Sequence, residues 1–334
     1  MRAFAGSLLV AAVGLALAGW YGFGDGGWAG ALDAAWIVAV LAVLEVSLSF
    51  DNAVVNASIL GRMSAVWQRR FLTWGMLFAV FGTRVVFPLA IVGSTAGLGP
   101  VAAVRMSLAD PARYEAILTG AHPAIAGFGG AFLVMVGVQF FLGRQGEAHW
   151  LGWPERALAA MGRVPGLGWL IAVAALAAVA WGCPAEALRG FLGGGLAGLV
   201  GFGAVHAVGH WLEGHAPQGA GGGFGLFVYL NLLDASFSLD GVIGAFALSN
   251  NMIVIAIGLT IGAVFVRSLT MALVRRGTLG NWAYLEHGAF WAILALGLVM
   301  LVSVLVPVPE AVTGLIGAVL IGAALWSSWR AQVR

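Results

Sequence analysis

Residues 34–59 read AAWIVAVLAVLEVSLSFDNAVVNASI, an apolar run interrupted by two acids, Glu45 and Asp51. The run is long enough to cross a bilayer core of about 30 Å, which takes about 20 apolar residues in a helix. A charged side chain at the centre of such a helix costs about 2.5–3.5 kcal/mol on insertion scales, so acids there indicate a function. The stretch therefore predicts a membrane span that carries a polar site.

The composition of the whole chain agrees with this prediction. Of its 334 residues, 61% are hydrophobic and only 9% are charged, whereas soluble domains have about 25% charged residues. The mean hydropathy of +0.98 covers the whole chain and cannot come from one anchor. We expect an all-α polytopic membrane protein, with residues 1–334 forming a single transmembrane domain.

Composition also excludes several classes of function. Cys183 is the only cysteine, so neither a disulfide framework nor a thiolate metal cluster is expected. All 16 basic residues are arginines, scattered singly or in pairs, which argues against a nucleic-acid partner. The glycines of 219–224 lack the strand–loop–helix setting of a phosphate loop, and no organic cofactor is expected.

Span length and hydropathy predict nine to ten transmembrane helices. The candidate spans are 4–22, 34–59, 71–96, 124–142, 167–182, 190–209, 225–248, 252–274, 287–306 and 310–329. With a cytoplasmic N-terminus, eleven arginines fall in cytoplasmic segments, three on the opposite side and two inside spans, as the positive-inside rule requires. Both termini are therefore expected in the cytoplasm. Arg2, the apolar run and Ala16-Leu17-Ala18 also resemble a cleaved secretory signal, but we favour a retained first helix.

A second segment repeats the polar pattern of the first. Residues 44–53 (LEVSLSFDNA) and 233–242 (LDASFSLDGV) align at a constant offset of 189 positions, with acid, serine, serine and aspartate in register. Five spans separate the copies, so they run in opposite directions, which is typical of secondary transporters. We predict repeat 1 over 34–142 and repeat 2 over 225–306. Residues 143–224 connect them with two peripheral spans.

Helical periodicity groups the polar side chains of both copies. Glu45, Ser49, Asn52 and Asn56 share one stripe of the first span, whereas Asp51 lies about 120° away, at 100° per residue. Either each helix serves two surfaces, or it is unwound around 49–52 and around 238–241; we favour the local break. The candidate metal ligands are Glu45, Asp51, Asn52, Asp234 and Asp240. The supporting residues are Ser47, Ser49, Asn56, Ser236, Ser238, Arg84 and Arg267.

These groups suit a hard divalent ion. Carboxylates, amide carbonyls and hydroxyls favour Mg²⁺, Mn²⁺ or Ca²⁺ over Zn²⁺ or Cu⁺. Four acids and two arginines leave a charge of −2, which one divalent ion would neutralise. Structural ion pairing within the bundle is the alternative for the acids.

The two motif copies and residues 284–289 (YLEHGA) resemble the TerC superfamily, and within it the DUF475 branch, over roughly 30–306. The resemblance implies an integral inner-membrane transporter of metal ions, with Mn²⁺ efflux as the favoured activity. It also implies that Glu45, Asp51, Asn52, Asp234 and Asp240 line the ion site. Gly241 stands where better-known members have a more elaborate motif after the second aspartate.

Two smaller histidine-containing groups have competing interpretations. His206 and His210 have the spacing of metal ligands on one helical face, although a solvated helix end is the favoured interpretation. Glu286 and His287 open a span, where they would pass protons or anchor the start of a helix.

The sequence bears on three other functions. Gly22-Phe23-Gly24-Asp25 matches a pattern of intramembrane aspartyl proteases but has no Tyr-Asp partner, so an enzyme is not expected. A membrane scaffold that serves metal homeostasis without transport stays open, as does transport of Ca²⁺ or Mg²⁺. The expected partners are the lipid bilayer and the metal ion as substrate; a homo-oligomer is left open.

Overall fold

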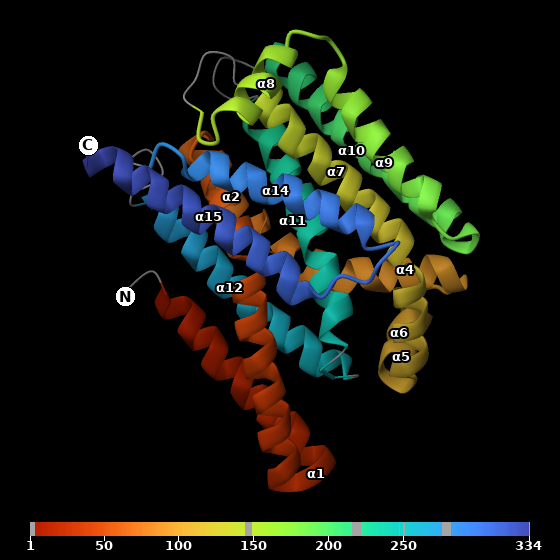
Figure 1. Cartoon of the computed structure of the whole chain (residues 1–334). Helices are drawn as coiled ribbons and strands as arrows, with labels where there is room; N and C mark the ends of the chain where they lie inside the picture. Colours follow the sequence, from red (N-terminus) through yellow and green to blue (C-terminus); the bar gives the residue numbers. More distant parts are fainter. Residues whose placement is uncertain are drawn as a thin grey trace. The chain divides into compact units, whose positions relative to one another are not determined.

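The computed structural model describes residues 4–75, 77–143, 149–215, 222–246, 248–249, 251–275 and 282–333. These residues form helices without a strand, and eight of the helices are long and apolar enough to cross a membrane (Figure 1). This confirms the prediction of an all-α polytopic membrane protein. The described chain divides into two compact units, which are taken in turn. Unit 1 comprises 1–49, 69–121 and 237–272; unit 2 comprises 50–68, 122–236 and 273–334.

The difference between eight helices and ten expected spans has two causes. Helix α1 (Ala5–Leu48) is continuous by hydrogen bonding but kinks at Gly26 and Gly27, so it contains the first expected span and half of the second. Helix α9 (Leu167–Gly182) has 16 residues, which is short for a span. Between the expected spans 71–96 and 124–142, the chain folds as two short helices, α5 (Pro100–Ala109) and α6 (Pro111–Gly120).

The kink folds α1 into a hairpin. Gly27 has a positive φ of 61°, which a residue with a side chain rarely adopts. A Cβ atom on Gly22 would lie 2.2 Å from the carbonyl oxygen of Gly30, a distance that only an antiparallel return allows. Ala18 and Ala34 are buried between the two arms. Small residues thus let the arms approach closely.

Helix α12 (Met252–Arg275) completes the core of unit 1. Cβ atoms on Gly258 and Gly262 would lie 2.6 Å from the Cβ of Leu41 and 2.4 Å from the Cβ of Glu45, so α12 packs tightly on the second arm of α1. The same unit contains two π-helical segments, η2 (Phe71–Gly75) and η3 (Phe78–Val86), and α4 (Phe87–Ala96). π-Helical turns occur often at functional sites.

The motif copies differ in backbone structure. Helix α1 ends at Leu48, Ser49 is a turn residue, and α2 (Phe50–Leu60) begins directly after it. A break is therefore present in the first copy, but it spans one residue only. The expected break at 238–241 is wrong, because α11 (Gly222–Ala245) is helical through this range. Gly241 alone does not interrupt the hydrogen-bond ladder of that helix.

Unit 2 is organised around α7 (His122–Gly143), most of whose residues are buried. It packs against α10 (Ala185–His215), α14 (Leu285–Val302), α9 and α8 (Trp153–Met161). Helix α15 (Glu310–Val333) packs on α14. The short α3 (Ala65–Arg70) follows α2 and is divided between the units.

Glycines determine how closely α7 and α10 approach. Cβ atoms on Gly194 and Gly198 would lie 2.0 Å and 2.3 Å from the carbonyl oxygens of Ala124 and Phe128, and one on Gly127 would lie 2.2 Å from that of Phe191. Real Cβ atoms essentially never come so near to backbone oxygen. The interface therefore requires glycine at these positions.

We expect Gly198→Ala to lower the free energy of unfolding by about 1–3 kcal/mol, the usual effect of overpacking. The measurement is reversible unfolding of the purified protein in detergent. Gly193→Ala is the matched control on the same helix, because nothing lies within 4 Å of its added Cβ. Equal stability of the two variants would contradict the glycine interface.

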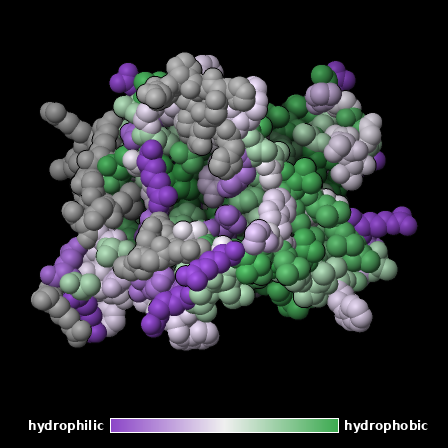
Figure 2. Space-filling model, turned by 90° about the horizontal axis from the view of Figure 1, so that it is seen from above, coloured by the Kyte–Doolittle hydropathy of each residue, from purple (hydrophilic) through white to green (hydrophobic). Residues whose placement is uncertain are grey.

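The surface of the described chain is rich in exposed apolar side chains. Figure 2 shows broad hydrophobic areas on the face that it draws. Large side chains such as Trp28, Trp153 and Trp181 are more than three-quarters exposed. In a protein with eight candidate spans, such surface is expected to face lipid.

Candidate functional site

Within unit 2, two asparagines of α2 converge on one carboxylate of α11. The side-chain amides of Asn52 and Asn56 both donate to Oδ1 of Asp234, at 2.9 Å and 2.7 Å. The two donors are one helical turn apart on α2, which places them on the same face. All three side chains are buried. The structure thus brings together three of the residues that the sequence predicted.

The same region contains buried amide oxygens without hydrogen-bond partners. Among the described residues, Oδ1 of Asn52, Asn56 and Asn231 have no partner. Their orientations are fixed, because each amide nitrogen donates to an oxygen that only accepts; for Asn231 this is the carbonyl of Phe227, at 2.7 Å. Buried polar atoms are nearly always satisfied, so each such oxygen requires an explanation.

Asp51 immediately precedes Asn52, at the start of α2. Its carboxylate accepts the backbone N–H of Asn52 at 2.8 Å. A Cβ atom on Gly317 of α15 would lie 2.8 Å from Oδ2 of Asp51, so the glycine leaves room for the acid. Asp51 is buried and forms no ion pair with the described chain. We call Asp51, Asn52, Asn56, Asn231 and Asp234 the amide–carboxylate cluster.

Within unit 1, Glu45 forms a buried ion pair with Arg84 of η3. The hydroxyl of Ser49 donates to Oε1 of Glu45 at 3.1 Å. Both charged side chains are under one-tenth exposed. Gly262 and Gly241 lie against the Glu45 side chain. A Cβ atom added to Gly241 would lie 3.3 Å from Oε2 of Glu45. The charge of Glu45 is therefore balanced by Arg84.

The other predicted site residues are placed as follows. Ser236 is buried and donates to the carbonyl of Leu232 at 3.0 Å. Ser47 is exposed and donates to the carbonyl of Val43, so it is directed away from these contacts. Arg267 is partly buried, with its Nε unpaired among the described groups. The side chains of Ser238 and Asp240 lie outside the described part of the structure.

The predicted five-residue ion site is divided between the units. Asp51, Asn52 and Asp234 belong to unit 2, whereas Glu45 and Asp240 belong to unit 1. Among the described residues, no group of three or more His, Cys, Asp or Glu side chains has the geometry to hold a metal ion. Any cation bound at the amide–carboxylate cluster would therefore rely on amide oxygens in addition to carboxylates.

The two histidine-containing groups differ in their surroundings. His206 is exposed, stacks on Phe202 at 4.3 Å between ring centroids and contacts the carbonyl of that residue. The side chain of His210 lies outside the described residues. Glu286 pairs with Arg62, which follows α2, and His287 is buried. Both Glu286 and His287 thus attach the start of α14 to its neighbours.

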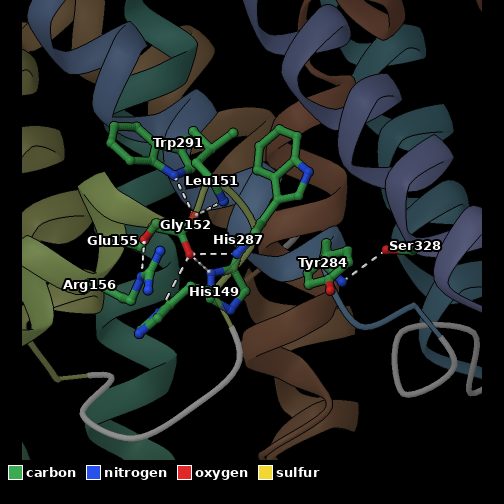
Figure 3. A network of polar contacts seen from close by, with 10 residues as sticks. His149, Leu151, Gly152, Glu155, Arg156, Tyr284, His287, Trp291 and Ser328 are labelled. Atoms are coloured by element: carbon green, nitrogen blue, oxygen red, sulfur yellow. Dashed lines mark hydrogen bonds and ion pairs between the residues drawn. The ribbon is translucent and has the colours of Figure 1, made fainter.

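One buried acid was not predicted. Glu155, only 1% exposed, is the acceptor for four donors in unit 2 (Figure 3). Three donors lie at 2.8 Å and the fourth at 3.3 Å: His287 Nδ1, Trp291 Nε1 and the backbone N–H groups of Trp150 and Leu151. His149 Nδ1 lies 3.8 Å from Oε2 of the same carboxylate. We call these six residues the Glu155 network.

Glu155 was missed because its local sequence gives no sign of burial. It follows Pro154 in the first turn of a short helix, where an acid ordinarily stabilises the helix from a solvent-exposed position. The nearby Trp150 and Trp153, which resemble interfacial tryptophans, were the available signal that this segment lies against other elements.

A family model described as Protein of unknown function (DUF475) matches residues 50–334. No curated protein and no solved structure matches the chain. The matched range contains α2, α11 and α14, and with them the amide–carboxylate cluster and the Glu155 network.

Proposed function

Since the chain belongs to the DUF475 family, whose description assigns no activity, we propose from its site that it is a secondary transporter of a divalent metal ion. The observation that carries the proposal is the amide–carboxylate cluster. It combines two buried carboxylates with three buried amide oxygens that lack partners in the described chain. These are hard oxygen ligands, and a divalent cation would satisfy both the charge and the orphaned acceptors.

The roles of the residues follow from their contacts. Asp51 and Asp234 would supply the charge, and Asn52, Asn56 and Asn231 would supply neutral oxygens. The α2 amides donate through nitrogen to Asp234, so their oxygens remain available to a cation. Glu45 is balanced by Arg84 and Asp240 stays a sequence-derived candidate. Both remain candidate ligands from the sequence.

The favoured substrate is Mn²⁺, moved out of the cell. This choice rests on the resemblance to the TerC superfamily, as do location in an inner membrane and export as the direction. Protonation of the carboxylates would weaken cation binding and offers a route to proton exchange. Alternating access through two inverted repeats, both termini in the cytoplasm and the absence of enzymatic activity remain parts of the proposal that come from the sequence.

The cellular test uses a strain that lacks its own manganese exporter. We expect the wild-type protein to lower cellular Mn after Mn²⁺ loading, and Asp51→Asn to abolish this effect, because the amide cannot balance a divalent charge. Elemental analysis at matched membrane levels is the measurement. Asp33→Asn is the matched control, since Asp33 is exposed on α1.

Three outcomes distinguish the candidate functions. Lower Mn with the wild type and the control, but not with Asp51→Asn, supports efflux through this site. Unchanged Mn with every protein rejects manganese export and moves the test to Ca²⁺ and Mg²⁺. If Asp51→Asn lowers cellular Mn as much as the wild type does, the scaffold is favoured, because a scaffold needs no charge in the membrane.

A further inference from the structure

Unit 1 contains a groove that belongs neither to the Glu45–Arg84 ion pair nor to the amide–carboxylate cluster. Its volume is about 670 Å³, within the range of about 300–1,000 Å³ that is usual for ligand pockets. Its walls come from the first arm of α1, from η3 and α4, from α5 and from the N-terminal part of α12. All of these segments belong to unit 1. The groove is therefore a feature of this unit alone.

The lining of the groove is almost entirely apolar. Among the residues that line it, only Ser107 and Thr260 have a polar side chain. The hydroxyl of Ser107 donates to the carbonyl of Val104 at 2.9 Å, so its proton already has an acceptor within α5. The lining side chains offer no charge to an ion, and a polar molecule would lose its hydrogen bonds to water there. The class of ligand that such a lining fits is a hydrocarbon chain.

The groove has a buried floor and exposed rims. Gly14 and Ile261 lie in the floor, where a Cβ atom on the glycine would be 2.7 Å from the isoleucine side chain. Leu9, Val13 and Phe81 lie on the rims, and each is more than half exposed. The helices that carry them are candidate membrane spans. The surface that the groove exposes is therefore expected to meet acyl chains.

The groove follows two antiparallel helices, the first arm of α1 and α12 (Figure 1). At one end the hydroxyls of Ser7 and Ser268 are 2.5 Å apart, and at the other the amide of Asn251 donates to the hydroxyl of Tyr21 at 3.0 Å. Between these contacts, residues 9–17 of α1 line the groove, a rise of about 12 Å at about 1.5 Å per residue. One leaflet is about 15 Å deep, half of a hydrocarbon core of about 30 Å. The groove thus matches the depth of an acyl chain in a single leaflet.

Helix α5 supplies a positive charge beside the groove. It packs near the C-terminal end of α4, where a Cβ atom on Gly93 would lie 3.8 Å from the Cβ of Ala103. Arg105 lies three residues before the lining residue Leu108 and therefore on the same helical face. Arg105 is exposed and forms no ion pair with a described residue. In the predicted topology α5 lies opposite the cytoplasm, and a guanidinium there suits the phosphate of a lipid head group.

We propose that this groove binds one acyl chain of a phospholipid from the non-cytoplasmic leaflet, with the lipid phosphate at Arg105. The apolar lining and the length of the groove select the chain, and the arginine selects an anionic head group. Phe81 lines the groove from η3, which also carries Arg84. The bound chain therefore contacts the segment whose arginine pairs with Glu45.

The test is native mass spectrometry of the full-length protein, extracted in mild detergent from vesicles of palmitoyl-oleoyl phosphatidylglycerol. We expect one phospholipid to remain bound to each wild-type chain. Val13→Trp should lower the retained fraction at least about tenfold, because the indole occupies space that the chain needs. Leu8→Trp is the matched control and should retain lipid like the wild type. Leu8 is 60% exposed on the same helix and is not one of the lining residues.

The head-group contact has its own comparison. Arg105→Glu reverses the charge beside the groove and should lower the retention of phosphatidylglycerol about fivefold, because exposed charge contacts are weak. Retention of diacylglycerol with the same two chains should stay unchanged, since this lipid has no phosphate. If Arg105→Glu retains phosphatidylglycerol as the wild type does, the assignment of a phospholipid is overturned.

Other results would overturn the groove as a lipid site. These are a wild-type protein that retains no lipid, or equal retention in Val13→Trp and the wild type. Lipid-free wild-type dimers that Val13→Trp converts to monomers would show that a second copy occupies the groove instead. If Val13→Trp does not fold, Ala256→Phe replaces it, because Ala256 lines the groove from α12 and is partly exposed. Lipid retention is measured without metal, so its outcome is separate from that of the proposed function.

Discussion

Asp234→Asn is expected to lower the apparent affinity for Mn²⁺ at least about 100-fold, or roughly 2.8 kcal/mol at 1.4 kcal/mol per tenfold change. The substitution keeps one carbonyl oxygen where Oδ1 now accepts from Asn52 and Asn56. The packing and both hydrogen bonds should therefore survive. What is lost is the negative charge, which sets the affinity of an oxygen site for a divalent ion. The measurement is the concentration dependence of Mn²⁺ uptake into proteoliposomes.

Asn56→Ala separates the contribution of charge from that of the amide oxygens. It removes one neutral oxygen and one hydrogen bond to Asp234 but leaves both carboxylates. We expect a smaller loss than for Asp234→Asn, and Asp33→Asn should match the wild type. If Asp234→Asn transports Mn²⁺ with wild-type affinity, the cluster is not the substrate site. Parallel uptake of Mg²⁺ and Ca²⁺ would then show whether the ion was misassigned.

Much of the fold was predictable because bilayer thickness imposes a length on each span. Every span predicted from hydropathy coincides with one helix or with consecutive helical segments. The errors arose where local backbone geometry decides the outcome. The return at Gly26 and Gly27 keeps helical hydrogen bonding on both sides, so α1 joins two predicted spans. At Gly241, glycine tolerance suggested a break, but the ladder of α11 is unbroken there.

The candidate site was predictable to the extent that chemistry is encoded in residue type. Acids and asparagines in an apolar helix stand out, and the structure places Asn52, Asn56 and Asp234 in contact. Asn231 is not among the predicted ligands, yet its amide oxygen is one of the acceptors without a partner among the described residues. The sequence does not specify which buried polar side chains contact one another. Nothing in the periodicity assigns Arg84 to Glu45, or Glu155 to His287.

Arg84→Met should lower the free energy of unfolding by about 3–5 kcal/mol, because it leaves the charge of Glu45 buried and unpaired. The arginine is 7% exposed and its guanidinium reaches Glu45 from a π-helical turn. Methionine occupies similar length without charge, so packing is largely retained. Unfolding of the purified protein in mixed micelles measures the change. Arg105→Met on the exposed face of α5 is the control and should stay within about 0.5 kcal/mol.

A double variant tests whether the ion pair serves stability or function. Replacing a whole buried pair by uncharged residues is often neutral for stability, so Glu45→Gln with Arg84→Met should recover most of what Arg84→Met loses. If the recovered protein still moves Mn²⁺, the pair is structural and Glu45 is no ligand. If the double variant folds but does not transport Mn²⁺, Glu45 takes part in the transport cycle. Arg84 then acts as the cation that pairs with Glu45 while no substrate is bound there. An Arg84→Met protein as stable as Arg105→Met would contradict the buried pair itself.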